Sequence, residues 1–218
     1  MPSGVPPGQI VTARWPVLHA GSVPTEVGPA NWSLSLHGEV ETPKTLSYSD
    51  LLALPQVDIT CDIHCVTSWS KLGMHWRGVA FSTLSAVVHP KASARFVVME
   101  CEQGFTTSLP IEALNDPDVL IAHTVEGGPL SAEHGGPVRM LVPKRYFYKS
   151  AKWLRGLKFV SVDAPGFWEV RGYSNIADPW AETRYDVDDV KVIHRMRKAS
   201  LFHPFTSKTE TGAEPPAH

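Results

Sequence analysis

Two of the three cysteines in the chain lie four residues apart and enclose a histidine, in the stretch CDIHC that holds Cys61, His64 and Cys65. Thiolate sulfur and imidazole nitrogen are common ligands of zinc and of other transition metals. A structural zinc site normally uses two such close pairs. The chain has no second pair, although Cys101 and a distant histidine could complete one. On an extended strand the two thiols would lie about 13 Å apart, too far for a disulfide. The spacing leaves three possibilities: a zinc-stabilised interaction domain, a pair of inert buried thiols, or a site for another metal.

The segment 134–162 contains no aspartate or glutamate, yet it holds seven of the twenty lysine and arginine residues. These seven are Arg139, Lys144, Arg145, Lys149, Lys152, Arg155 and Lys158. Taken alone, such a run is typical of a solvated basic face or of a phosphate- or nucleic-acid-binding module. The residues around Pro143 and Ser150 suggest that a strand ends and a turn of helix begins near Ser150, where free N–H groups could bind a phosphate. Neither a G-x-G-x-x-G loop nor a G-x-x-x-x-G-K-[ST] loop is present, so a larger ligand of another kind is expected.

Cys65 differs from Cys61 in its surroundings. It ends an apolar stretch and enters VTSWSKLG, whose small residues permit close backbone approach and whose Trp69 could form one wall of a pocket. Positive charge from the basic segment would stabilise a thiolate there. A soft thiolate suits a metal that also carries oxo or sulfur ligands. We therefore expect Cys65 to be the functional thiol and Cys61 to be a buried, inert one.

Length and composition indicate one soluble globular unit. The chain has 218 residues, 43% of them hydrophobic and 19% charged, with a net charge of -2. The global positive excess of a typical nucleic-acid-binding protein is absent, so no nucleic-acid partner is expected. We expect a flexible N-terminus over residues 1–9, a single domain over residues 10–205 and a disordered tail over residues 206–218. No signal segment and no run of roughly 20 apolar residues is present, so we expect no membrane span and a cytoplasmic location.

The hydrophobic pattern predicts an α+β fold, with a core of mixed β-sheet and short helices. Residues 31–40 alternate apolar and polar side chains, which is typical of a half-buried strand. Further strands are expected at 57–66, 94–101, 118–125, 138–143 and 157–164. Short helices are expected at 47–55, where Ser47 or Ser49 could cap the first turn, and at 81–89. Residues 106–114 combine a strand with a helical turn, and residues 126–137 form a turn-rich connection.

Several motifs, taken in order, resemble one known family. They are GEVETPKTLSYSDLLALPQVDITCDIHCVTSWSKLGMHWRGV, HGGPVRMLVPKRYFYKSAKWLRGLKFV, PGFWEVRGYSN and DPWAETRY. Together they closely resemble the molybdopterin-binding domain of the sulfite oxidase-like molybdenum oxidoreductases, over about residues 12–185. The resemblance implies an enzyme with that family's fold and with the molybdenum-molybdopterin cofactor.

The resemblance also implies roles for individual residues. Cys65 would be the protein ligand of molybdenum, and His64 would border the metal as a catalytic neighbour. The cofactor-binding residues that it implies are Arg14, His19, His64, Cys65, Glu100, Cys101, His134, Arg139, Lys149, Ser150, Ala151 and Lys152. His64, His75 and Tyr173 are candidates for proton relay, because they carry groups that can exchange protons.

The activity implied by the resemblance is oxygen-atom transfer on a small substrate, with sulfur compounds among the candidates. No C-x-x-C-H haem motif is present, so electrons are expected to pass to or from a separate partner protein. Eukaryotic sulfite oxidases follow their cysteine with a run of Gly, Asn and Arg that helps to bind the anionic substrate. The stretch CVTSWS lacks that run, and sulfite is therefore not implied as the substrate.

Overall fold

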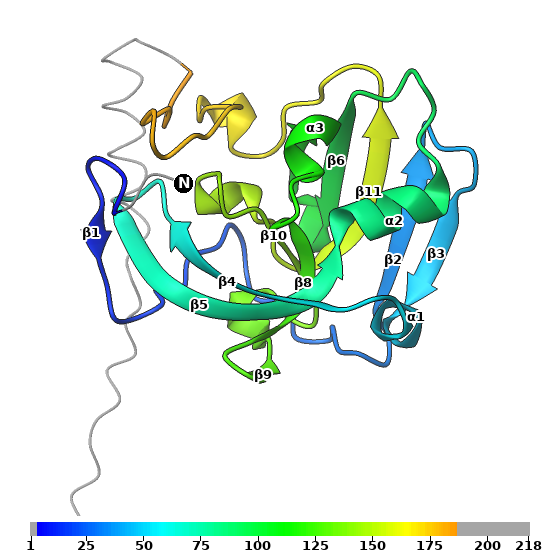
Figure 1. The fold of residues 1–218 in the computed structure, drawn as a ribbon, viewed down its shortest axis with the longest axis horizontal. Helices are drawn as coiled ribbons and strands as arrows, with labels where there is room; N and C mark the ends of the chain where they lie inside the picture. Colours follow the sequence, from blue (N-terminus) through cyan, green and yellow to red (C-terminus); the bar gives the residue numbers. More distant parts are fainter. Residues whose placement is uncertain (1–3, 187–218) are drawn as a thin grey trace, which may run out of the picture. The chain divides into compact units, whose positions relative to one another are not determined.

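The strand that ends just before Cys65 belongs to a six-stranded sheet in the computed structural model, which describes residues 4–186. The strands of this first sheet are β1 (Ile10–Val11), β4 (Val57–His64), β5 (Trp69–Ala80), β8 (Leu120–Val125), β9 (Gly128–Pro129) and β10 (Arg139–Leu141). Their order is β1-β5-β8-β10, while β4 pairs with β5 and β9 pairs with β8. Only β1 and β5 run parallel in this sheet. The β4–β5 hairpin extends away from the second sheet and reaches β1 (Figure 1).

A second sheet of five strands supports the other side of the core. Its strands are β3 (Lys44–Ser47), β2 (Ser33–Gly38), β11 (Leu154–Val160), β6 (Phe96–Cys101) and β7 (Thr106–Pro110), in the order β3-β2-β11-β6-β7. β11 runs parallel to β2 and antiparallel to β6. Both sheets thus mix parallel and antiparallel pairs, and the α+β class predicted from the sequence is confirmed.

The helices are short, as the sequence predicts. They are α1 (Tyr48–Ala53), α2 (Phe81–Val88) and α3 (Ile111–Leu114), with 3-10 turns η1 (Glu102–Gly104), η2 (Ala132–His134), η3 (Phe147–Lys149) and η4 (Glu169–Arg171). Ser47 caps α1: its hydroxyl accepts from the N–H of Asp50, and the Asp50 carboxylate accepts from the N–H of Ser47. This reciprocal pair satisfies N–H groups that the first helical turn leaves free.

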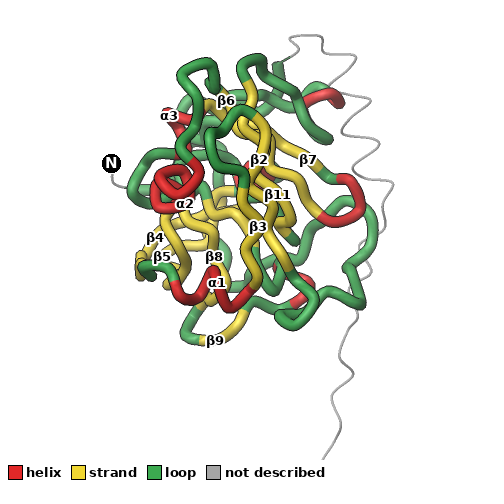
Figure 2. The backbone as a smooth tube through the Cα atoms, turned by 90° about the vertical axis from the view of Figure 1, so that its right-hand side faces the viewer, coloured by secondary structure: helices red, strands yellow, loops and turns green. Residues whose placement is uncertain are grey.

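The main core fills the space between the second sheet on one side and α2 with the first sheet on the other (Figure 2). Leu34 and Leu36 of β2, the inward members of the alternating strand, are fully buried there with Phe81 of α2 and Phe159 of β11. A smaller cluster covers one face of the first sheet: Ile63, Met74, Trp76, Leu120, Ala122, Leu130 and Leu141. Among residues 4–186, no helix is long and apolar enough to span a bilayer.

Two local predictions are wrong. The longest strand is β5, and no strand was predicted for its residues. It was missed because Gly73 and Gly78 interrupt its apolar pattern. The turn of helix expected to begin at Ser150 instead ends there, since η3 spans Phe147–Lys149 and Ser150 is its C-terminal cap. The proposed anion site at a helix start near Ser150 therefore does not exist in this form.

The described residues include the predicted N-terminal boundary of the domain but not the C-terminal one. Residues 4–9 are joined to the domain: Pro6 is buried, and the side chain of Gln9 donates a 3.0 Å hydrogen bond to the carbonyl of Cys65. Gln9, the last residue of the predicted flexible segment, is thus hydrogen-bonded to the turn that follows β4. The rest of the predicted domain after residue 186 and the predicted tail at 206–218 lie outside the described residues.

Substitution of Gly78 should destabilise the first sheet. A Cβ at this position would lie 2.3 Å from the carbonyl oxygen of Ile121 on β8, which is backbone and cannot move aside alone. We expect Gly78→Ala to lower the free energy of unfolding by about 2 kcal/mol in urea titrations. Gly28→Ala is the matched control, since a Cβ there meets no heavy atom within 4 Å. Equal stabilities of the two variants would contradict the close approach of β5 and β8.

Candidate functional site

Cys65 opens the turn that joins β4 to β5. The turn is closed by backbone hydrogen bonds: the N–H of Cys65 donates to the carbonyl of Trp69 at 2.8 Å, and the N–H of Ser68 donates to the carbonyl of Cys65 at 3.0 Å. Ser68 has φ +76°, in the left-handed region. β1 supports the turn from the side, because the N–H of Ile10 donates to the carbonyl of Ser68 at 2.9 Å. The position of the thiol is thus held by backbone contacts on both sides.

The thiol of Cys65 is buried but lies near positive charge. It is 8% exposed, and its sulfur is 3.1 Å from the hydroxyl of Thr67. Burial raises the pKa of the thiol, whereas hydrogen bonding to Thr67 and the charges of Arg184 and Lys152 lower it. Arg184 is fixed beside the turn by a 2.5 Å hydrogen bond to the carbonyl of Val66. These cations favour the thiolate form that a metal requires.

His64 is buried next to Cys65 at the end of β4. Its ring is 5% exposed, and its Nδ1 lies 2.8 Å from the hydroxyl of Ser70. The ring also meets the edge of Trp180, with centroids 6.4 Å apart. Burial lowers the pKa of this imidazole, and the charge of Asp62 offsets part of the effect. A neutral imidazole therefore borders the thiol near neutral pH.

Arg139 and Lys152 are cations that have no carboxylate partner among residues 4–186. Arg139 is 1% exposed and donates only to carbonyls, including those of His134 at 2.7 Å and Ser150 at 2.6 Å. Burial lowers its pKa to about 9. The pKa of Lys152 falls to about 7, because of burial and then the repulsion of Arg139. Arg139 is buried, whereas Lys152 is half-buried. Unpaired charge with little access to water is costly, so this region can accommodate an anionic ligand.

Other members of the basic segment are neutralised by acids from outside it. Lys144 lies 2.9 Å from Asp116, and Arg155 lies 2.8 Å from Glu102. The absence of acids in the sequence of segment 134–162 therefore does not produce a continuous free basic face. Which cations of this segment can bind a ligand depends on the acids that lie next to them in the folded protein.

Lys149, predicted to contact a phosphate, is fully engaged inside the protein. Its ammonium is 2.5 Å from the carboxylate of Glu169 and donates at 2.9 Å to both the carbonyl of Ser108 and the side-chain oxygen of Asn175. Three acceptors account for its three N–H groups. Contact with a phosphate would require one of these bonds to break, so the structure gives Lys149 a structural role.

A group of flat rings lies against Arg139. Trp15 stacks on the ring of His134 with centroids 3.6 Å apart, and its edge meets Trp76 at 5.4 Å. The guanidinium of Arg139 lies 4.3 Å from the ring centroid of Phe147. Nδ1 of His134 is buried without a partner among the described residues, and burial lowers the pKa of this ring to about 4. A ligand with flat rings and hydrogen-bonding groups fits such walls.

The remaining predicted residues fall into two sets. Ser150 and Ala151 are buried beside β10, where the Ser150 hydroxyl accepts from the N–H of Val142 at 2.9 Å and the Ala151 carbonyl accepts from the N–H of Met140 at 2.9 Å. These two positions frame Arg139, because the carbonyl of Ser150 is one of its acceptors.

Residues from the N-terminal segment and from β6 lie around this core of the site. His19 is exposed near Trp153, and the pKa of His19 is lowered by burial and then by Lys152. Cys101 is buried near Arg139, and burial raises the pKa of its thiol. Glu100 instead pairs with His37 at 2.9 Å, and Arg14 is exposed. The structure thus brings His19 and Cys101 to the basic group but shows no contact of Glu100 or Arg14 with it.

Sequence inspection missed Gln9, Trp15, Thr67 and Arg184 as individual site residues. Trp15 stands between the predicted Arg14 and His19, and Arg184 stands in the quoted motif DPWAETRY. Their position inside these segments was therefore the signal that could have identified Trp15 and Arg184 as site residues. The contacts of Gln9, Trp15 and Arg184 are with segments more than 50 residues away in sequence, which no local pattern reveals, whereas Thr67 contacts Cys65 two residues before it.

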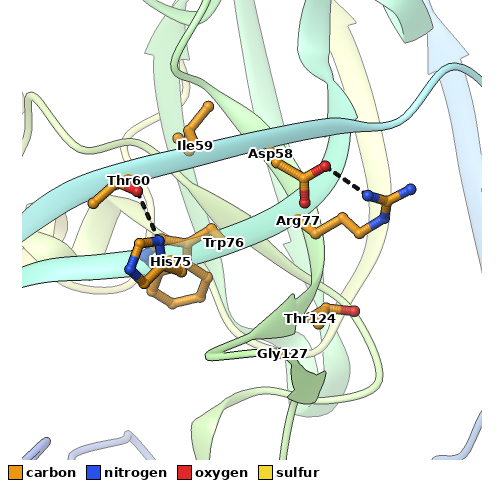
Figure 3. Close-up of a pocket in the computed structure, with 8 residues that line it drawn as sticks. All are labelled: Asp58, Ile59, Thr60, His75, Trp76, Arg77, Thr124 and Gly127. Atoms are coloured by element: carbon orange, nitrogen blue, oxygen red, sulfur yellow. Dashed lines mark hydrogen bonds and ion pairs between the residues drawn. The ribbon is translucent and has the colours of Figure 1, made fainter.

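A surface hollow of about 300 Å³ lies on another part of the first sheet (Figure 3). It is lined by Asp58, Ile59, Thr60, His75, Trp76, Arg77, Thr124 and Gly127. His75 points to Thr60 there, with 2.8 Å between Nδ1 and the hydroxyl, and Asp58 pairs with Arg77. His75, a predicted proton relay, makes no hydrogen bond to the Cys65 turn among the described residues. Trp76 lines this hollow and also lies beside Trp15 at the candidate site.

The structure gives no support to a zinc site. In residues 4–186, no group of three or more His, Cys, Asp or Glu side chains is arranged to hold a metal ion, and all three cysteines are free thiols. The pKa of Cys61 is raised to about 12 by burial and by Asp118 and Asp62, which suits an inert thiol.

Comparisons with known proteins agree on one family. Residues 20–168 match the family model described as oxidoreductase molybdopterin binding domain. The chain is 42% identical over 184 residues to the uncharacterized oxidoreductase YuiH of Bacillus subtilis, covering 84% of this chain and 93% of that protein. It is 27% identical over 183 residues to the protein-methionine-sulfoxide reductase catalytic subunit MsrP of Ralstonia nicotianae, covering 74% and 54%.

A solved structure shows the same architecture. The sulfane dehydrogenase SoxCD from Paracoccus pantotrophus superposes with a TM-score of 0.59 and 26% identity, over 63% of this chain and 40% of that chain. The chain thus spans nearly all of the Bacillus relative but about half or less of the Ralstonia and Paracoccus proteins.

The internal role of Lys149 can be tested by removing its charge. Lys149→Met would leave the carboxylate of Glu169, which is 8% exposed overall, without its cation. We expect a loss of about 3 kcal/mol in the free energy of unfolding, measured by urea titration. The double variant Lys149→Met/Glu169→Leu should regain part of this loss. A single variant as stable as the wild type would mean that the pair does not form.

Because Lys152 has no carboxylate partner among residues 4–186, we expect the free energy of unfolding of the cofactor-free chain to depend on pH. Its folded pKa of about 7 lies below the ordinary 10.5, so between these values the unfolded state binds more protons. The free energy of unfolding should therefore rise with pH from 7 upward. Urea titrations at pH 7, 8 and 9 should show a smaller rise in Lys152→Gln, while Lys158→Gln, at an exposed position, should behave as the wild type. Identical slopes in all three proteins would contradict the burial of an unpaired Lys152.

Proposed function

This chain belongs to the oxidoreductase molybdopterin-binding family, and from that premise we propose that it transfers an oxygen atom to or from a small sulfur compound. Members of the family are enzymes that use the molybdenum-molybdopterin cofactor, and the chain is such an oxidoreductase. The observation that carries the proposal is the thiol of Cys65, which is held in a closed turn and lies near Arg184 and Lys152. Of these two cations, Lys152 has no carboxylate partner among residues 4–186.

The residues of the site fit this cofactor. Molybdopterin carries a phosphate, and Arg139 and Lys152 are cations whose carboxylate partners are absent from residues 4–186. It also carries flat fused rings with hydrogen-bonding edges, which suit the aromatic walls and the unpartnered buried Nδ1 of His134. The metal needs a soft protein ligand, and Cys65 is the thiol beside these groups. The proposed ligand set is therefore Cys65 for molybdenum, with Arg139, Lys152 and His134 around the organic part.

When bound, the cofactor supplies a two-electron redox change and an exchangeable oxygen atom. Cys65 contributes a thiolate and so gives up its proton when the metal binds. Arg139 and Lys152 contribute positive charge that an anionic group neutralises. His64 contributes an imidazole at the rim of the metal position, where it can hold a hydrogen bond to substrate or water. The burial of the thiol limits access of bulk water to it.

Sulfur is favoured as the reacting atom by what two similar proteins are named for: methionine sulfoxide in one and sulfane in the other. For a sulfoxide, the balanced reaction takes up two electrons and two protons and yields a sulfide and water; the reverse reaction releases them. Free basic side chains after Cys65 are lacking, since the turn reads Val66, Thr67 and Ser68. The turn itself therefore supplies no cation for an anionic substrate such as sulfite, and we favour a neutral sulfoxide.

The electrons are proposed to pass to or from a separate protein. MsrP is named as a catalytic subunit, which implies further subunits in that system. The alternative of a nucleic-acid-binding module is less favoured, because Lys144, Lys149 and Arg155 are paired internally. A cytoplasmic location is part of the proposal, and cell fractionation tests it.

The two thiols provide a matched pair of variants. We expect purified protein from a host that makes molybdopterin to contain close to one molybdenum atom per chain by elemental analysis. With a reduced dye as electron donor it should reduce a dialkyl sulfoxide. Cys65→Ser should abolish turnover and leave the unfolding curve almost unchanged, whereas Cys61→Ser should retain activity. Equal losses in both variants would show that Cys65 is not the ligand, and absence of molybdenum would refute the proposed function.

A further inference from the structure

The side chains of Gln9 and Ser70 connect the backbone of Cys65 to the ring of His64. The amide nitrogen of Gln9 donates to the carbonyl of Cys65 at 3.0 Å, and the hydroxyl of Ser70 donates to the amide oxygen of Gln9 at 3.3 Å. Nδ1 of His64 lies 2.8 Å from the same hydroxyl. Ser70 is completely buried and His64 is 5% exposed, so water has little access to this connection.

The direction of every hydrogen bond in this connection follows from its first member. A backbone carbonyl can only accept, so the NH₂ group of Gln9 must face Cys65 and its oxygen must face Ser70. That oxygen can only accept, so Ser70 must use its single hydrogen there. The hydroxyl oxygen is then left as an acceptor for His64. The hydrogen of the neutral imidazole must therefore reside on Nδ1.

We propose that Gln9 is a positioning residue that sets the tautomer of His64. With the hydrogen on Nδ1, Nε2 carries a lone pair and enters the site as an acceptor. Among the described residues, the hydrogen bond of the His64 ring is made through Nδ1 and not through Nε2. His64 can then accept a hydrogen bond from water or a protonated substrate group, but cannot donate one. This role rests on the proposed function, in which Cys65 and His64 border the reacting atoms.

Gln9 also connects the tautomer to the geometry of the metal ligand. Its amide holds the carbonyl of Cys65 from outside the turn, while the N–H of the next residue, Ile10, holds the carbonyl of Ser68 at 2.9 Å. One side chain thus fixes both the turn that bears the thiol and the hydrogen position on the neighbouring ring. Neither function requires Gln9 to touch the substrate.

Nitrogen-15 NMR of labelled histidine side chains tests the inference directly. The full chain is purified from cells that make the cofactor and from cells that do not. The chain has ten histidines, so the His64 signals are identified as those missing from His64→Gln. We expect wild-type His64 to carry hydrogen on Nδ1 alone in the cofactor-free chain. In Gln9→Leu, Ser70 is free to donate to the ring, and we expect a mixture of both tautomers.

Gln9→Glu is the matched control, because a carboxylate still accepts from Ser70 although it cannot donate to the carbonyl of Cys65. It should keep the wild-type tautomer. If Gln9→Leu does not fold, Ser70→Ala serves instead, since it removes the acceptor that selects Nδ1. Hydrogen on Nε2 in the wild type, or a tautomer that does not change in Gln9→Leu and Ser70→Ala, would overturn the inference. A merely space-filling Gln9 predicts that unchanged result.

The loaded enzyme gives a second readout. Gln9→Leu should keep its molybdenum content and lose roughly tenfold in kcat, as expected for one hydrogen bond to the reacting site worth about 1.4 kcal/mol. Unchanged kcat together with a changed tautomer would overturn the catalytic relevance of Gln9. Failure of the proposed function appears differently, as a wild-type chain without molybdenum, while the tautomer measurement in the cofactor-free chain remains decisive for the hydrogen-bond connection.

Discussion

The arrangement of the site depends on two cations, the buried Arg139 and the half-buried Lys152, that have no carboxylate partner among residues 4–186. Lys149 and Lys152 are three residues apart, yet they are treated in opposite ways. Lys149 has the carboxylate of Glu169, whereas Lys152 donates to the carbonyl of Glu133 and lies near Arg139. A carbonyl dipole satisfies a hydrogen bond but leaves the net charge in place. This contrast separates a cation that holds the fold together from the cations that we propose bind an anionic ligand.

Binding of a metal at Cys65 and neutralisation of these cations are electrically linked. Burial raises the pKa of the thiol by more than Thr67, Arg184 and Lys152 lower it, so the ligand-free site holds a protonated thiol near neutral pH. Metal binding removes the proton and places negative sulfur near the same cations. The thiolate then relieves part of the repulsion that Lys152 experiences from Arg139. The thiolate and an anionic ligand therefore draw on the same cations.

The sequence predicted elements whose pattern is local. Alternating Leu34 and Leu36 marked β2, and Ser47 marked the start of α1, because period and capping act within a few residues. β5 was missed because Gly73 and Gly78 break its pattern, and the helix near Ser150 was misplaced by one turn. Family membership, fold and cofactor were recognised from ordered motifs. The roles of individual site residues stay predictions.

The contacts of the site that could not be predicted from the sequence join residues that are far apart along the chain. The Cys65 turn is contacted by Gln9, 56 residues before it, and its Val66 carbonyl by Arg184, 118 residues after it. A run of basic residues also cannot reveal which members have acids beside them, as Lys149 shows. The candidate site is the remainder after internal pairing among residues 4–186: a thiol, two cations without a carboxylate partner, and an imidazole whose hydrogen, as proposed above, is directed away from the site. That remainder is visible only once the distant segments have been brought together, and it matches the electrical and geometric needs of a metal bound to an anionic organic ligand.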